Sequence, residues 1–277
     1  MTDGCAVFQA ALENGTLREK TRAACWAAAV GLQAVDHWTV SGRLVELAHR
    51  HIEGKLTLDA VRRDVAAYWQ GRLTEETTLA DKTAVNIVVF LSEKRRACRL
   101  TVTDYLRVNA EVFAGVFLFA GTLRTCNLTK AEPVFAGDTV RYADFRDIPA
   151  ALNYDFSQEA KFGYDGLSKA ETVRHLAAFA AGLWQIHAFC EGNTRTTLLF
   201  LDRYLRGKGW MPDCRVPASQ ARLFRDALVR AVYEDRRRGI KADSSDLEMF
   251  FRAWLLGEPF ADGHNAASAD ENEGRHL

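Results

Sequence analysis

Proline is nearly absent from the first half of this 277-residue chain. There are five prolines in all, and none lies between Met1 and Glu132. Proline breaks helices, whereas alanine, leucine and arginine, which are abundant in this half, favour them. The sequence therefore predicts a largely helical first half.

The chain also lacks long apolar runs and an excess of charge of either sign. No stretch approaches the roughly 20 uninterrupted apolar residues of a membrane span. Lys plus Arg and Asp plus Glu both number 36, so the formal net charge is zero. Binders of nucleic acid or of membrane surfaces generally need a positive excess, and we expect neither partner. Residues 1–12 lack the basic region and apolar core of a secretory signal, which indicates a cytoplasmic protein. Delivery into another cell by a signal-independent system stays open.

Closely spaced cysteines are missing as well. None of the six lies two to four residues from another, so the spacings of zinc knuckles and thioredoxin-like motifs are absent. Scattered cysteines in a chain of this size are typical of reduced, cytosolic thiols. The six are Cys5, Cys25, Cys98, Cys126, Cys190 and Cys214.

Hydrophobic residues make up 48% of the chain, enough for a sizeable core. Their spacing, with Ser41 and Thr57 as candidate N-caps, predicts a series of helices. Residues 123–142 have turn residues among short apolar stretches and predict a short hairpin or an irregular loop. The small, polar tail is predicted to be disordered. The helices are predicted at residues 19–30, 41–52, 58–69, 78–93, 102–119, 149–159, 168–185, 193–206, 218–233 and 245–255.

One segment between two predicted helices carries the residues of a chemical site. It reads His187-Ala-Phe-Cys-Glu191-Gly192-Asn193-Thr194-Arg195. Free N–H groups at the start of the second helix would form an anion site. Arg195 offers a planar fork suited to phosphate, and Glu191 a carboxylate for a divalent cation. His187 would be a base close to a bound phosphorus atom. Together these residues predict a site for phosphoryl or nucleotidyl transfer.

The segment resembles the motif of the Fic family, His-x-Phe-x-Asp/Glu-Gly-Asn-Gly-Arg-x-x-Arg, at six positions: His187, Phe189, Glu191, Gly192, Asn193 and Arg195. Upstream, Phe117-Leu-Phe-Ala-Gly-Thr-Leu-Arg-Thr-Cys-Asn-Leu-Thr-Lys is similar to the stretch that leads into the flap of that family. The resemblance extends over about residues 100–255. It implies an all-α Fic-fold helical bundle with a short β-hairpin flap, here residues 124–142, that aligns the target.

The resemblance also implies an activity. Fic proteins transfer a nucleoside monophosphate, usually AMP from ATP, to a Ser, Thr or Tyr hydroxyl of a protein, with Mg²⁺ as cofactor. By matching positions, His187 would take the hydroxyl proton and Glu191 would bind magnesium. Asn193 and the nearby amides of Gly192 and Thr194 would hold the α-phosphate. Arg195 would hold the β-phosphate, and Phe189 would anchor the loop in the core.

Two motif positions differ from the family pattern. Thr194 replaces the second glycine, and its hydroxyl or backbone could still serve the anion site. Leu198 replaces the final arginine, which in the family contacts the terminal phosphates. Losing such a contact would cost roughly 1.5–3 kcal/mol, about ten- to a hundredfold in nucleotide affinity. Either Leu198 is a core residue, or the donor is not a triphosphate in the usual pose.

The N-terminal stretch Val40-Ser-Gly-Arg-Leu-Val-Glu-Leu-Ala-His-Arg-His-Ile-Glu-Gly-Lys-Leu-Thr-Leu-Asp-Ala-Val is similar to the small helical antitoxin module that accompanies some Fic proteins. In that module a Ser/Thr-x-x-x-Glu-Gly/Asn motif carries a glutamate that pairs with the final motif arginine and blocks ATP. The best register places Ala29, Gln33 and Ala34 at the three specified positions. Gln33 and Leu198 would then replace both halves of that contact. An ordinary amphipathic extension is the alternative.

We therefore expect an N-terminal helical, antitoxin-like module at 1–75, a Fic domain at 76–260 and a disordered tail at 261–277. The expected partners are a nucleotide and a protein that bears a hydroxyl, and a homo-oligomer stays open. Two other functions remain: transfer from another phosphate-containing donor, or a degenerate Fic scaffold that binds a partner protein. Retention of His187 and Glu191 argues against a mere scaffold, which needs neither a base nor a metal carboxylate.

Overall fold

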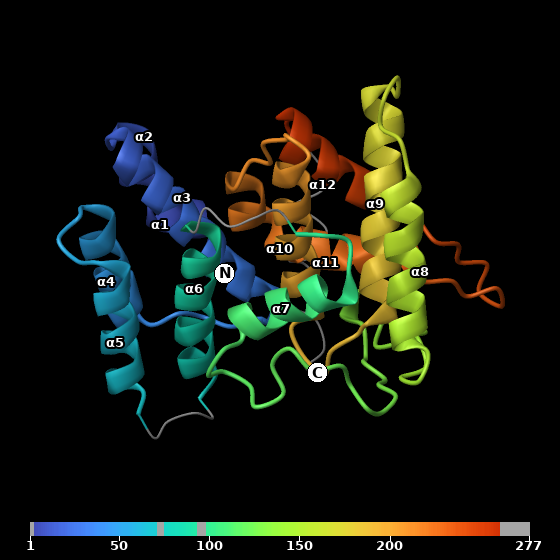
Figure 1. Cartoon of the computed structure of the whole chain (residues 1–277), viewed down its shortest axis with the longest axis horizontal. Helices are drawn as coiled ribbons and strands as arrows, with labels where there is room; N and C mark the ends of the chain where they lie inside the picture. The colour runs from blue at the N-terminus through green and yellow to red at the C-terminus, as the bar shows by residue number, and fades with distance from the viewer. Residues whose placement is uncertain (1–2, 71–74, 93–97, 261–277) are drawn as a thin grey trace, which may run out of the picture.

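The computed structural model describes residues 3–70, 75–92 and 98–260. Over these ranges the protein is all-α, and it has no β-strand there (Figure 1). The α-helices are α1 (Gly4–Val7), α2 (Gln9–Asn14), α3 (Leu17–Gly31), α4 (Gly42–Ile52), α5 (Leu58–Tyr68), α6 (Glu76–Ser92), α7 (Val102–Val112), α8 (Ile148–Lys161), α9 (Lys169–Ile186), α10 (Asn193–Gly207), α11 (Arg215–Val232) and α12 (Ser245–Leu256), with 3-10 helices η1 (Leu32–Asp36) and η2 (Pro133–Phe135).

Several helices start at capping residues in the sequence, although α8, α10, α11 and α12 have no side-chain cap. The Ser41 hydroxyl accepts a hydrogen bond from the Leu44 amide at 3.0 Å, and Thr57 caps α5 in the same way. A capping box between Ser168 and Glu171 starts α9. The all-α class is thereby confirmed, and both predicted N-caps are correct. The short helices α1 and α2 were not predicted.

The helix predicted at 102–119 ends earlier, at Val112. Contacts from distant parts of the chain end it. The Asn86 side chain donates hydrogen bonds to the carbonyls of Val112 and Ala114, and the Asn109 side chain accepts one from the Gly121 amide. The chain therefore turns, and the Phe113 ring is buried beneath it.

The segment predicted as a β-hairpin flap, residues 124–142, is irregular instead. One antiparallel bridge, between Glu132 and Asp138, encloses the single turn of η2, and Ala136 has a left-handed backbone. Glu132 is fully buried, and its carboxylate accepts a hydrogen bond from Tyr142 and pairs with Arg225 of α11. These side-chain contacts fix the segment in place of a strand ladder.

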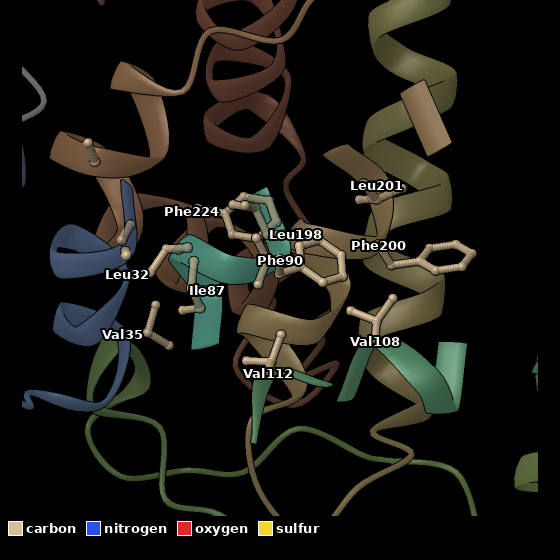
Figure 2. Packing of buried hydrophobic residues seen from close by; sticks show 14 of the residues in the cluster. Leu32, Val35, Ile87, Phe90, Val108, Val112, Leu198, Phe200, Leu201 and Phe224 are labelled. Atoms are coloured by element: carbon tan, nitrogen blue, oxygen red, sulfur yellow. The ribbon is translucent and has the colours of Figure 1, made fainter. Parts of the chain in front are cut away.

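Helix α10 lies at the centre of the fold, and every residue from Asn193 to Leu205 is buried. It packs against α7 and α9, and the N-terminal helix α3 packs against α6 and α11. Figure 2 shows Leu32 of η1, Ile87 of α6 and Leu198 of α10 within one apolar cluster. The N-terminal helices thus share the core of the segment that carries the motif, and the division at residue 75 stays a prediction.

Among the described residues, no helix has the length and apolar character that a membrane crossing requires. The predicted disordered tail, 261–277, lies outside the described residues, as does Glu93 at the end of the helix predicted at 78–93.

Candidate functional site

His187 ends helix α9 in a left-handed backbone conformation, with φ of 51°. Arg124, the first residue of the flap segment, holds it there. The Arg124 guanidinium donates a hydrogen bond to the His187 carbonyl at 2.7 Å, and the Arg124 amide donates one to the Ala188 carbonyl at 2.9 Å. The histidine is therefore fixed by a contact that spans 63 positions in the sequence.

The His187 imidazole is buried, with 4% of the residue exposed, and neither ring nitrogen has a hydrogen-bond partner among the described residues. Its ring stacks on Tyr142 at 4.0 Å between centroids and meets the edge of Trp184. Burial, reinforced by the positive charges of Lys130 and Arg124, holds the pKa of His187 well below its usual value. The imidazole is thus neutral near pH 7 and has a nitrogen free to accept a proton.

The loop that follows His187 is braced from within. The Asn193 side chain accepts a hydrogen bond from the Phe189 amide at 2.9 Å and donates one to the Phe189 carbonyl at 2.8 Å. Gly192 has φ of 79°, and a Cβ there would lie 2.2 Å from the Phe113 ring. The predicted phosphate role of Asn193 can therefore belong only to its backbone N–H, in the first turn of α10, where amides have no partner within the helix.

Glu191 fits the predicted role of a metal ligand by its exposure. Its side chain is 44% exposed, and its carboxylate lies 3.4 Å from the Lys130 ammonium. No group of three or more metal-ligating side chains occurs in the described part of the chain. A magnesium ion that keeps its waters and binds substrate phosphates needs only one or two carboxylates, so Glu191 alone is compatible with it.

The side chain of Thr194 is occupied by a structural contact. Its hydroxyl accepts a hydrogen bond from the Trp184 indole N–H at 2.9 Å, and the residue is nearly buried. This bond ties the end of α9 to the start of α10. Because the hydroxyl is the acceptor in this bond, its own O–H stays available, so both the Thr194 hydroxyl and the Thr194 backbone N–H can donate to an anion.

Arg195 differs most from its predicted role. Its side chain is 0% exposed and donates hydrogen bonds to Gln33 at 2.8 Å and to the Asp36 carboxylate at 2.5 Å. The guanidinium also lies over the rings of Trp38 and Phe113, at 4.3 and 5.0 Å from the centroids. Burial lowers the pKa of Arg195, and Asp36 opposes that shift. The predicted phosphate ligand is therefore held by the N-terminal segment of its own chain.

Leu198 is a core residue, only 1% exposed, and belongs to the cluster in Figure 2. Gln33, placed by sequence register at the latch position, does reach the motif. It contacts Arg195, however, and not the helical position of Leu198.

A cavity of about 30 Å³ is lined by His187, Glu191 and the start of α10, and Arg195 is not among its lining residues. That volume suits about one water molecule. Other residues complete its wall. Asp36, Lys130, Glu132 and Arg225 come from distant segments, which is why the sequence did not single them out, whereas Trp184 lies on α9 three residues before His187. For Lys130 one sequence feature could have indicated a place at the site: it ends the stretch from Phe117 to Lys130, which resembles the segment that leads into the flap of the family.

No curated protein matches the sequence. The structure is similar to an N-terminal Fic domain of an effector protein from Bartonella sp. AR 15-3, with 16% identity, a TM-score of 0.51, and coverage of 66% of this chain and 84% of that one. It is similar to the BepC effector from Bartonella tribocorum with bound AMPPNP, with 16% identity, a TM-score of 0.51 and coverage of 65% and 87%.

A third similar structure is the N-terminal Fic domain of a cell filamentation protein from Bartonella quintana, with 20% identity, a TM-score of 0.50 and coverage of 66% and 82%. At these identities the similarity concerns the fold alone. The model of the Fic/DOC family matches residues 99–205, which contain both the motif and Arg124. The chain therefore contains a Fic/DOC-family domain.

Proposed function

We propose that this protein is a Fic-type transferase that moves a nucleoside monophosphate, AMP from ATP, onto a Ser, Thr or Tyr hydroxyl of a target protein. One observation carries the proposal: His187 is buried and neutral next to the first turn of α10, and neither of its ring nitrogens has a hydrogen-bond partner in the part of the chain that the structure describes. An unpaired polar side chain in such a place is costly, which favours a functional reason for it.

The residues of the site would act in three ways. First-turn amides of α10 bind the α-phosphate, with the helix dipole behind them. Lys130, 3.4 Å from Glu191, adds a positive charge that attracts the nucleotide. His187 accepts the proton of the target hydroxyl. The hydroxyl oxygen then bonds to the α-phosphorus, and the bond to the β-phosphate oxygen breaks to release pyrophosphate.

Magnesium would be held by Glu191 and by the phosphates of the donor, and it would supply charge neutralisation of the leaving pyrophosphate. Before it binds, the Glu191 carboxylate is paired with Lys130. Release of that exposed pair costs little, because exposed ion pairs contribute about 0–1 kcal/mol.

The donor requires the site to open. Ligand pockets typically measure about 300–1,000 Å³, far above the 30 Å³ of this cavity. Asp36 is a wall residue on η1, its side chain is 34% exposed, and its carboxylate pairs with Arg195. We therefore propose that residues 1–75 act as an antitoxin-like module, whose η1 segment holds Arg195 away from the β-phosphate until it moves.

A second candidate is transfer from a different phosphate-containing donor. It is favoured by Leu198, which is buried and offers no contact to a terminal phosphate. A donor with fewer phosphates beyond the bond that breaks would not need that contact.

The test is a transfer assay with magnesium and ATP labelled at the α-phosphate, on cell lysate and on the protein itself. Wild type is compared with His187→Ala and with Asp36→Asn, and a panel of other labelled donors follows. Label on protein that wild type produces and His187→Ala loses by about 10²–10⁴-fold supports a transferase with His187 as base. A productive donor other than ATP selects the second candidate.

Equal labelling by wild type and a correctly folded His187→Ala variant would contradict the role of His187. No label from any donor, by wild type or by Asp36→Asn, combined with no nucleotide binding, would leave the degenerate scaffold as the better function.

A further inference from the structure

A second cleft lies outside the candidate active site, between α5, α6 and the turn that follows α7. Its volume is about 410 Å³. That is within the range of small-molecule sites, about 300–1,000 Å³, and more than ten times the cavity at His187. The two cavities share no lining residue.

The charged side chains of the cleft are mostly basic. Arg62, Arg63 and Lys82 line it, against one acid, Asp59. Asp59 lies 4.0 Å from Arg62, the limit of an ion pair. Neither Arg63 nor Lys82 has a hydrogen bond or an ion pair to any residue that the structure describes. Two of the three positive charges therefore have no counterion within the described ranges, in a chain whose formal net charge is zero.

Lys82 is the informative member because it is partly buried on α6. Burial lowers the pKa of its ammonium group, and no nearby carboxylate opposes the shift. An ammonium in that position is stabilised by an anion that enters the cleft. A solvated surface lysine would gain much less from one.

Most of the remaining wall is apolar; the polar exception, Asn86, donates hydrogen bonds to the carbonyls of Val112 and Ala114. Val65 and Val85 are buried and form its floor, and Ala66 and Ala114 complete it. A hydrated inorganic ion would leave that floor without a partner. A ligand with one anionic end and one apolar or aromatic body matches both parts of the cleft.

We propose that the α5–α6 cleft binds a small organic phosphate, whose phosphate group contacts Lys82 and Arg63 and whose apolar body lies on Val65 and Val85. Phosphate is the anion that arginine and lysine recognise together, arginine through its fork and lysine as a point charge. The site is separate from the proposed transfer chemistry, and its test does not depend on activity.

The experiment is isothermal titration calorimetry of the full chain with 1-naphthyl phosphate, with inorganic phosphate and 1-naphthol as the two half-ligands. We expect saturable binding of 1-naphthyl phosphate that is tighter than that of either half. Lys82→Gln is expected to weaken it about tenfold or more, Arg63→Gln by a smaller factor, and added salt should weaken it further. Thermal denaturation of each variant checks that the fold is intact.

Two controls separate this cleft from other basic sites. Lys130→Gln removes a positive charge at the candidate active site, and Arg18→Gln removes one from the exposed start of α3. Both should bind like wild type. No saturable binding by wild type, or binding that Lys130→Gln abolishes and Lys82→Gln leaves unchanged, would overturn the proposal.

Discussion

The two halves of the motif segment, residues 187–191 and residues 193–198, differ in how far their side chains are bound by other parts of the protein. Residues 187–191 present a neutral imidazole without partners and a half-exposed carboxylate. Residues 193–198 begin only two positions later, yet the side chains of Asn193, Thr194 and Arg195 all have partners within the protein. Leu198 lies in the core.

Within one short stretch, the side chains proposed to react are thus distinct from those that make structural contacts. His187, the proposed base, has no hydrogen-bond partner among the described residues, and Glu191 pairs with the partly exposed Lys130, whereas the side chains of Asn193 and Arg195, proposed to hold phosphate, are held within the protein. Arg195 is the decisive case, because Asp36 and Gln33 occupy its fork. Whether the Arg195 guanidinium is available to a ligand therefore depends on the N-terminal segment as much as on the motif.

Among the substitutions that test this difference between the two halves, Leu198→Arg is expected to change the free energy of unfolding most. It restores the family pattern in sequence but places a charge in a fully packed cluster. We expect the free energy of unfolding to fall by about 4 kcal/mol or more, because a buried charge without a partner is strongly unfavourable. Urea denaturation measures it, with Leu198→Met as a volume-matched control that should cost less than about 1.5 kcal/mol. A stable Leu198→Arg protein with tighter nucleotide binding would show that this half of the motif is accessible.

Gly192→Ala tests the boundary between the two halves. The new Cβ would overlap the Phe113 ring, and φ of 79° disfavours any side chain. We expect a loss of about 2–5 kcal/mol in the free energy of unfolding. Gly239→Ala has a similar φ of 69° with open space around it, and it should cost only about 1–2 kcal/mol. Equal losses would mean that the close approach of Phe113 contributes nothing.

Asp36→Asn addresses the second half directly. It removes the charge that pairs with Arg195, and we expect the free energy of unfolding to fall by about 1–2 kcal/mol, since Asp36 is partly exposed. Affinity for ATP, measured by calorimetry, should rise because the guanidinium becomes available to phosphate. Asp64→Asn, which breaks an exposed pair with Arg43, is the matched control. Unchanged ATP affinity in the Asp36 variant would mean that Arg195 does not contribute to binding of the donor.

The smallest expected effect is the contribution of His187, in the first half, to the pH dependence of the free energy of unfolding. The pKa of His187 lies well below its unfolded value of about 6.5. Below pH 6.5 the unfolded state binds more protons, so the free energy of unfolding falls as the pH is lowered towards the folded pKa; above pH 6.5 the term is absent. For His187 the loss at pH 5.5 is up to about 1.4 kcal/mol.

Urea denaturation of wild type and His187→Gln at pH 7.5 and 5.5 isolates that term. His51, whose pKa burial also lowers, is present in both proteins and cancels in the difference. The same pH dependence in wild type and variant would contradict a neutral, buried His187.

Local sequence was sufficient for most helices and for the start of the site. Capping residues such as Ser41 and Thr57 act within three residues of themselves, so the helix starts could be predicted. The order of His187, Glu191 and Gly192 predicted their meeting at one loop, because side chains so close in sequence cannot separate far. The helix that ended early, at Val112, was beyond such reasoning, because Asn86, 26 positions away, holds its last carbonyl.

The sequence by itself thus determined the helical class, the loop that carries His187 and Glu191, and the absence of the final arginine at Leu198. Tertiary structure alone decided that Arg195 is occupied, since its partner Asp36 lies 159 positions away. It also decided that the flap segment forms one bridge, because buried Glu132 is fixed by Tyr142 and Arg225. Local propensity acts over a few residues, whereas burial and charge pairing act between any segments that the fold brings together.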